Sequence, residues 1–174
     1  MDFQLNQALP ILRRTPAVLD ELLRDLDDDW VNSNEGPDTW SPHDIVGHLI
    51  HGDEADWVPR AKVILAHGTA RAFEPFDRFA QFEKSKGKTL GQLLEKFGQV
   101  RQHNLGELNS MQLTPNQMTK RGRHPDLGEV TLGELLATWT VHDLSHISQI
   151  TRVMCKQYSA AVGPWKEYLP ILSR

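Results

Sequence analysis

The chain has 174 residues, 39% hydrophobic and 24% charged, an ordinary balance for one globular domain spanning residues 1–174. Its formal net charge of −4 argues against a nucleic-acid partner, and no apolar run approaches the ~20 residues that a membrane-spanning helix needs. The single cysteine, Cys155, cannot form an internal disulfide, and the N-terminus lacks the pattern of a secretion signal, so we expect a cytoplasmic protein.

Apolar residues recur at helical spacing in four stretches, and no stretch alternates as a half-buried strand does, so the sequence predicts an all-α fold. The first stretch runs from about Phe3 to Leu26, and Pro10 and Pro16 within it predict a bend or a restart. The second begins at Ser41–Asp44, where Ser caps the helix, Pro takes the first helical position and Asp lies in the first turn. We expect this second helix to continue to about Gly68.

The third and fourth predicted helices both open with a capping box. Thr89–Gln92 starts the third, which continues to about Leu108, and Thr131–Glu134 starts the fourth, which continues without proline to Cys155. About twenty residues, Thr69 to Lys88, join the second helix to the third, too many for a tight antiparallel turn. We therefore expect a four-helix bundle in which this long crossover between helices 2 and 3 lets them run parallel.

Three shorter segments lie outside these helices. The basic stretch Lys120–His124 is too short for a phosphate-binding patch and predicts a solvated loop. The tail Gly163–Pro170 predicts a short apolar cap on the bundle. The phenylalanines from Phe73 to Phe82 predict core packing, with the lining of a substrate pocket as the alternative. If they instead form an apolar surface patch, a homodimer is possible.

The most informative pattern is the pair His142 and His146. Four residues apart in a helix, the two imidazoles lie on one face and can bind the same divalent metal ion. A helical wheel places both on the apolar stripe that includes Leu135 and Ile150. Two unpaired buried imidazoles would each cost ~1–3 kcal/mol, which either a metal ion or hydrogen bonds within the core would remove.

A third ligand must come from another helix. His48 flanks the apolar face formed by Ile45 and Leu49, and antiparallel packing of the second and fourth helices brings it to a depth comparable with the pair. The rival ligand, His51, projects about 60° to the far side of His48, and we expect it to face solvent.

Several polar side chains near the proposed site have simpler explanations than chemistry. Asp44 suits a charge in the first helical turn, and Asp56 suits an ion pair with Arg60 one turn later. Asp143, about 100° from His142 on the wheel, is better placed to bond to another helix than to act as a base.

Three motifs together resemble the DinB-like superfamily of metal-dependent bundles. They are the opening Trp40–Pro42, the His48–Leu49 pair and the HxxxHxxQI stretch His142–Ile150, in this order and spacing. The resemblance spans nearly the whole chain, from the segment Leu12–Pro16 to Arg152.

The resemblance implies an up-down-down-up four-helix bundle in which His48, His142 and His146 hold a divalent metal ion. It also implies that Gln149, the glutamine of the HxxxHxxQI stretch, supports the site or a neighbouring helix. Characterised relatives include transferases that use low-molecular-weight thiols, such as bacillithiol or mycothiol, and proteins described as metal-dependent hydrolases. Imidazole suits several metals, of which we expect Zn or Ni, and three nitrogen ligands leave open positions for water or thiolate.

The expected function is therefore a metal-dependent thiol S-transferase or hydrolase acting on a small molecule. Because Cys155 faces away from the proposed metal, an attacking thiol must come from outside the chain. The alternative is a non-catalytic metal-binding or stress-response helical module. No catalytic base is assigned from the sequence.

Overall fold

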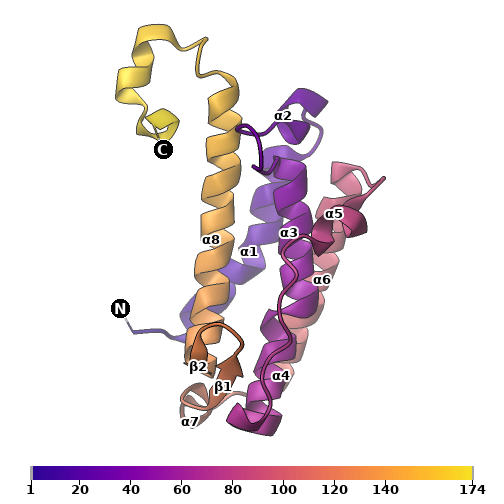
Figure 1. Cartoon of the computed structure of the whole chain (residues 1–174), viewed down its shortest axis with the longest axis vertical. Helices are drawn as coiled ribbons and strands as arrows, with labels where there is room; N and C mark the ends of the chain where they lie inside the picture. The colour runs from indigo at the N-terminus through magenta and orange to yellow at the C-terminus, as the bar shows by residue number, and fades with distance from the viewer. Residues whose placement is uncertain (1, 174) are drawn as a thin grey trace.

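The computed structural model describes residues 2–173, so residues 1 and 174 of the expected domain lie outside it. The bundle helices are α1 (Leu5–Leu23), α3 (Pro42–Ala55) continued by α4 (Trp57–His67), α6 (Leu90–Ser110) and α8 (Leu132–Gln157). In Figure 1, α1 and α8 run in one direction while α3, α4 and α6 run in the other. The predicted up-down-down-up four-helix bundle is confirmed.

Shorter elements join these helices. They are α2 (Asp28–Asn32), the 3-10 turn η1 (Gly68–Ala70), α5 (Ala80–Ser85), α7 (Pro115–Met118), the strands β1 (Arg121–His124) and β2 (Gly128–Thr131), and the 3-10 turns η2 (Gly163–Tyr168) and η3 (Pro170–Ser173). The chain between α4 and α6 returns along the bundle, as the predicted crossover requires (Figure 1). Of the helices in residues 2–173, none combines the length and apolar character needed to cross a bilayer.

Capping boxes start three of the helices where the sequence predicts them. Ser41, Thr89 and Thr131 each accept a hydrogen bond from the backbone N–H three residues later. The side chain of that later residue accepts in return from the cap's own backbone N–H, so both otherwise unpaired donors are satisfied. Asp44 has this role at the start of α3, as expected.

The second predicted helix is not continuous, which corrects the sequence analysis. It breaks at Asp56, where φ is −110° and ψ is −75°, and α4 begins at the next residue. Pro59 contributes to the break because it has no N–H to donate to the carbonyl of Ala55 four residues earlier. The predicted pairing of Asp56 with Arg60 is confirmed across this junction.

The predicted solvated loop at Lys120–His124 is also wrong, because most of it forms strand β1. β1 pairs antiparallel with β2, with Arg121 opposite Thr131. Gly122 is buried, and a Cβ atom there would lie only 2.6 Å from Cγ1 of Ile64 and 2.9 Å from Cζ of Phe73. The glycine therefore lets this hairpin pack closely against α4 and the crossover.

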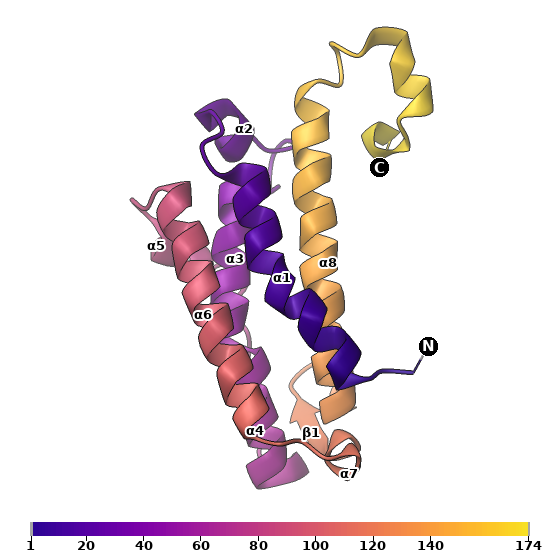
Figure 2. The same ribbon diagram turned by 180° about the vertical axis from the view of Figure 1, so that it is seen from behind.

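The C-terminal tail does not cap the bundle as predicted. With 26 residues α8 is about 39 Å long, whereas the 21 residues of α6 span about 32 Å, so α8 extends beyond its neighbour. The turns η2 and η3 follow from this projecting end, clear of the other helices in both views (Figures 1 and 2). Trp165 and Tyr168 consequently remain 72% and 77% exposed.

Helix α1 runs without a restart through both of its prolines, and one of them creates a hydrogen-bonding position in the core. Pro16 has no N–H, so the carbonyl of Leu12 lacks its usual partner within the helix. The Nη1 atom of Arg101, on α6, donates to this Leu12 oxygen at 2.8 Å. A buried carbonyl that would otherwise be unpaired is thereby satisfied.

Arg101 connects all four bundle helices. Its Nε and Nη2 atoms donate to the carboxylate of Asp53 on α3 at 2.7 and 3.0 Å. Its Nη1 and Nη2 atoms donate to the carboxylate of Asp143 on α8 at 2.5 and 3.0 Å, which confirms the predicted role of Asp143 in bonding to another helix. Both carboxylates and the guanidinium are almost completely buried, and Trp139 donates to Asp53 from α8 at 3.2 Å.

Replacing Arg101 with Met should lower the free energy of unfolding by ~3–5 kcal/mol, because two buried carboxylates lose their counter-charge. Urea denaturation of the purified variant measures the change. The control is Lys96→Met on the same helix, which removes a half-exposed cation lying 3.3 Å from Glu54 and should cost no more than ~1 kcal/mol. Equal losses in the two variants would contradict a special role for Arg101.

Candidate metal centre

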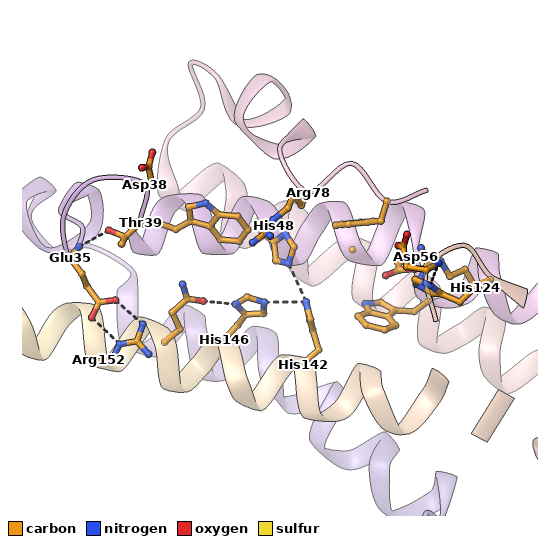
Figure 3. Close-up of a pocket in the computed structure, with 17 residues that line it drawn as sticks. Glu35, Asp38, Thr39, His48, Asp56, Arg78, His124, His142, His146 and Arg152 are labelled. Carbon is orange, nitrogen blue, oxygen red and sulfur yellow. Dashed lines mark hydrogen bonds and ion pairs between the residues drawn. The ribbon is translucent and has the colours of Figure 1, made fainter. Parts of the chain in front are cut away.

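Three histidines from two helices meet in the interior of the bundle. His48 comes from α3, and His142 and His146 come from α8. The Nε2 atom of His142 lies 3.1 Å from Nε2 of His48 and 3.1 Å from Nε2 of His146 (Figure 3). The structure thus brings together the three side chains that the sequence singled out, with one ligand atom from each within 4.8 Å of the others.

The separations of Nε2 of His142 from the other two nitrogens suit a common metal ion. Two imidazole nitrogens bound to Zn²⁺ at ~2.0–2.1 Å with tetrahedral or right-angle geometry lie about 2.8–3.4 Å apart. The 3.1 Å separations on either side of His142 fall within that interval. Without a cation, the central Nε2 atom can donate its proton to only one neighbour, whereas a cation satisfies all three lone pairs together.

Burial keeps the three imidazoles neutral at physiological pH. It lowers the pKa of His48 to about 3 and that of His142 to about 2, with the charge of His146 as the next cause in both. Burial also lowers the pKa of His146. Since only the neutral imidazole offers a lone pair to a metal, the cluster is ready to bind one without first losing protons.

One hydrogen bond orients the ligand atom of His146. Its Nδ1 atom lies 2.8 Å from Oε1 of Gln149, an oxygen that can only accept, so the ring proton is on Nδ1 and the lone pair is on Nε2. The predicted supporting role of Gln149 is confirmed. The Nδ1 atoms of His48 and His142 are buried and have no hydrogen-bond partner in residues 2–173.

Aromatic rings surround the histidine cluster. Trp40 packs against His48 with 4.8 Å between ring centroids, and Trp57 packs edge-on against His142 at 5.0 Å. Gly52 lies beside both rings, since a Cβ atom there would be in van der Waals contact, 3.4 Å from Nε1 of Trp57 and 4.0 Å from Cε1 of His142. Trp139 lies in the core behind Trp57 and does not line the site.

The histidines open onto a cavity of about 550 Å³, large enough for a small metabolite. Figure 3 shows the cavity extending on both sides of the cluster. Glu35 and Arg152 lie at one end, whereas Asp56 and His124 lie at the other. Of the crossover phenylalanines, Phe76 lines the cavity, Phe73 is buried in the core, and Phe79 and Phe82 are exposed.

His51 does not face solvent, contrary to the sequence analysis, and it does not join the cluster either. Its Nε2 atom lies 3.0 Å from the carbonyl oxygen of Asp77, and its Nδ1 atom lies 3.0 Å from Nζ of Lys84. The helical wheel correctly turns His51 away from α8, but the crossover covers that face of α3. His51 therefore ties the crossover to the bundle.

Glu35 is a cavity residue that sequence reasoning missed. It lies in the loop between α2 and α3, where no periodicity marks it. Its carboxylate accepts from Arg152 at 2.7 and 2.8 Å and lies 3.0 Å from Nζ of Lys156. The hydrogen bond from Arg152 is the main cause that lowers the pKa of Glu35 to about 2, so this carboxylate stays ionised and is no proton acceptor near pH 7.

The buried histidines should make the metal-free protein sensitive to acid. The unfolded pKa of ~6.5 exceeds the folded pKa of about 3 for His48, so below pH 6.5 the unfolded state binds more protons and stability is lost as pH falls. For His48 this loss amounts to ~2 kcal/mol between pH 7 and pH 5.

Urea denaturation at both pH values, in the presence of chelator, tests this on wild type and His48→Gln. The loss of unfolding free energy between pH 7 and pH 5 should be ~2 kcal/mol smaller in the variant. The buried Asp53, whose pKa is raised to about 6, adds stability as pH falls, but this contribution is the same in both proteins and cancels in the comparison. An identical loss in both proteins would contradict the neutral state of His48. The exposed His67, replaced by Gln, is the control.

Comparison with known proteins places this architecture in a family. The structure is similar to that of YfiT from Bacillus subtilis, with a TM-score of 0.77 and 24% sequence identity over 88% of this chain and 87% of that chain. This likeness shows a shared fold. Among curated proteins, none matches the sequence. The family model of the DinB superfamily matches residues 11–150, well over half of the chain, and the chain therefore belongs to the DinB superfamily.

Proposed function

We propose that this protein is a metal-dependent hydrolase of a small molecule, with His48, His142 and His146 holding a divalent ion. The observation that carries the proposal is the convergence of three neutral Nε2 atoms at the wall of a cavity. Three nitrogen ligands leave coordination positions open, which is typical of catalytic rather than structural zinc sites. Zn²⁺ and Ni²⁺ are the ions we expect, since both suit imidazole.

The similar fold of YfiT supports the proposal. That structure is described as a probable metal-dependent hydrolase with an unusual four-helix bundle topology. The likeness by itself concerns the fold, and the histidine cluster adds the chemical argument for this chain.

The chain's own residues would prepare the site for such a reaction. When bound, a divalent ion supplies Lewis-acid chemistry, which polarises a carbonyl or phosphoryl oxygen and makes water or a thiol nucleophilic near pH 7. Gln149 orients the imidazole of His146, while Trp40 and Trp57 pack against the other two histidines. These aromatic rings lower the local polarity, which strengthens electrostatic interactions at the site.

Thiol transfer is the second candidate, favoured by the two-sided shape of the cavity. Space on either side of the histidines suits two reactants, such as a low-molecular-weight thiol and an electrophile. The thiol would have to come from outside, because Cys155 is exposed and does not line the cavity.

A non-catalytic metal-binding or stress-response module is the alternative to an enzyme. The bundle has two buried apolar clusters of its own, so metal binding is not needed for folding.

A cytoplasmic location and a homodimer are further parts of the proposal. The exposed Trp165 and Tyr168 in the tail offer an apolar surface for a dimer.

Metal binding is tested by titrating the chelator-treated protein with Zn²⁺ and Ni²⁺ in a calorimeter and by elemental analysis. Wild type should bind one ion per chain, and His142→Ala should lose binding because a ligand is removed. Gln149→Leu should bind ~10–100-fold more weakly, because the imidazole of His146 loses the partner that orients it.

Two other histidines provide the controls for metal binding. His51→Ala removes the rival ligand, and His67→Ala removes an exposed imidazole remote from the cluster; both should keep wild-type stoichiometry. Metal binding that survives in His142→Ala, or that disappears in His51→Ala, would contradict the proposed ligand set.

The reaction type is tested with the zinc-loaded and nickel-loaded protein. Hydrolysis predicts product from aryl esters or amides without any added thiol, and no product with His142→Ala. Consumption of a thiol that requires both an electrophile and the metal would instead establish transfer. Full metal occupancy without turnover in either assay would favour the non-catalytic module.

A further inference from the structure

Arg78 differs from the other arginines that line the cavity, because it has no acidic partner. Arg60 pairs with Asp56, and Arg152 pairs with Glu35 at 2.7 Å. Within the described part of the chain, no carboxylate oxygen lies within the 4.0 Å of an ion pair from the Arg78 guanidinium. One positive charge in the cavity is therefore left for a ligand.

Two aromatic rings lie beside this guanidinium, on a residue that is otherwise exposed. Its Cζ atom lies 5.7 Å from the ring centroid of Trp40 and 5.6 Å from that of Phe79, within the range of cation–π contacts. A cation–π contact uses no hydrogen-bond donor, so it leaves the N–H groups of a guanidinium available to a ligand. Figure 3 shows Arg78 beside His48, above the histidine cluster.

The backbone that carries Arg78 is tied to α3 on both sides. The carbonyl oxygen of the preceding residue, Asp77, lies 3.0 Å from Nε2 of the buried His51. The Asp77 side chain accepts from the backbone N–H of Phe79 at 3.0 Å, and Lys84 in α5 reaches Glu54 at 3.1 Å. These contacts hold the backbone on either side of Arg78 against α3, whereas the Arg78 side chain is exposed.

The charges around the histidines favour an anion. Imidazole ligands carry no negative charge to offset a divalent ion, and Arg78 adds a further positive charge beside His48. Two of the carboxylates that line the cavity, Glu35 and Asp56, are already paired with arginines. The remaining lining carboxylates, Asp38 and Asp126, belong to opposite ends of the cavity.

We propose that Arg78 binds an anionic group, a carboxylate or a phosphate, of the small molecule whose reactive group faces the three histidines. The inference rests on the proposed function and adds a substrate class to it: a small organic anion with an apolar body that contacts the rings of Trp40, Trp57 and Phe76. Arg78 determines specificity in this arrangement and is not a metal ligand. Its forked N–H groups match the oxygens of either anion.

The test uses chelator-treated protein, so that no probe can bind through a metal ion. Benzoate and phenyl phosphate are the anionic probes and benzamide is the neutral one, each titrated by calorimetry. At least one anion should bind about tenfold or more tightly than benzamide, and this preference should shrink in high salt. Comparing the two anions distinguishes a carboxylate from a phosphate site.

Arg78→Gln should abolish the preference for anions, because the guanidinium that recognises them is gone. Arg71→Gln is the matched control, an exposed arginine in the same segment that lies 3.9 Å from Glu74, and it should behave as wild type. Arg78→Lys should keep a reduced preference, since the charge remains without the fork. If Arg78→Lys also loses the preference for anions, the effect comes from a disturbed cavity wall, and the inference is overturned.

Zinc titration of the same proteins separates this inference from the proposed function. Arg78→Gln should bind zinc with wild-type stoichiometry. Zinc binding by wild type without any anion preference would overturn the role of Arg78 alone. Anion preference without zinc binding would overturn the hydrolase proposal and leave the anion site standing.

Discussion

The buried contacts of Arg101 are the constraint on which the rest of the structure depends. One guanidinium on α6 reaches a free carbonyl on α1, a carboxylate on α3 and a carboxylate on α8. Because each of these partners is desolvated, any shift of one helix would leave a buried polar group unpaired. The interaction also reaches the candidate site, since Asp143 directly follows His142 and Asp53 lies on the same helix as His48.

The chemistry proposed for the histidines follows from this fixed geometry. Helices held at one depth place His48 opposite His142 and His146, and the surrounding tryptophans remove them from water. Removal from water disfavours the protonated imidazole, so the same packing that brings the rings together also keeps their lone pairs available. The same desolvation is what should make the metal-free protein sensitive to acid.

The crossover contributes more than the connection between parallel helices. It covers His51, provides Phe76 to the cavity wall, and carries Arg78 to the side of His48. Two of its cations differ in their contacts: Lys84 pairs with Glu54 and anchors the segment, whereas Arg78 contacts the rings of Trp40 and Phe79. The segment predicted from the sequence as a crossover that could line a pocket therefore supplies two residues of the cavity wall, Phe76 and Arg78.

The sequence by itself determined the features that depend on residues within about one helical turn of each other. Capping boxes marked the starts of α3, α6 and α8, and helical spacing put His142, His146 and Gln149 on one side of α8. Family resemblance added the order of helix directions. Tertiary structure alone decided the burial of His51, the hairpin packed on Gly122, the partners of Arg101 and the solitary charge of Arg78. These features arise where segments distant in sequence meet, and no local periodicity encodes which side chain will face which partner.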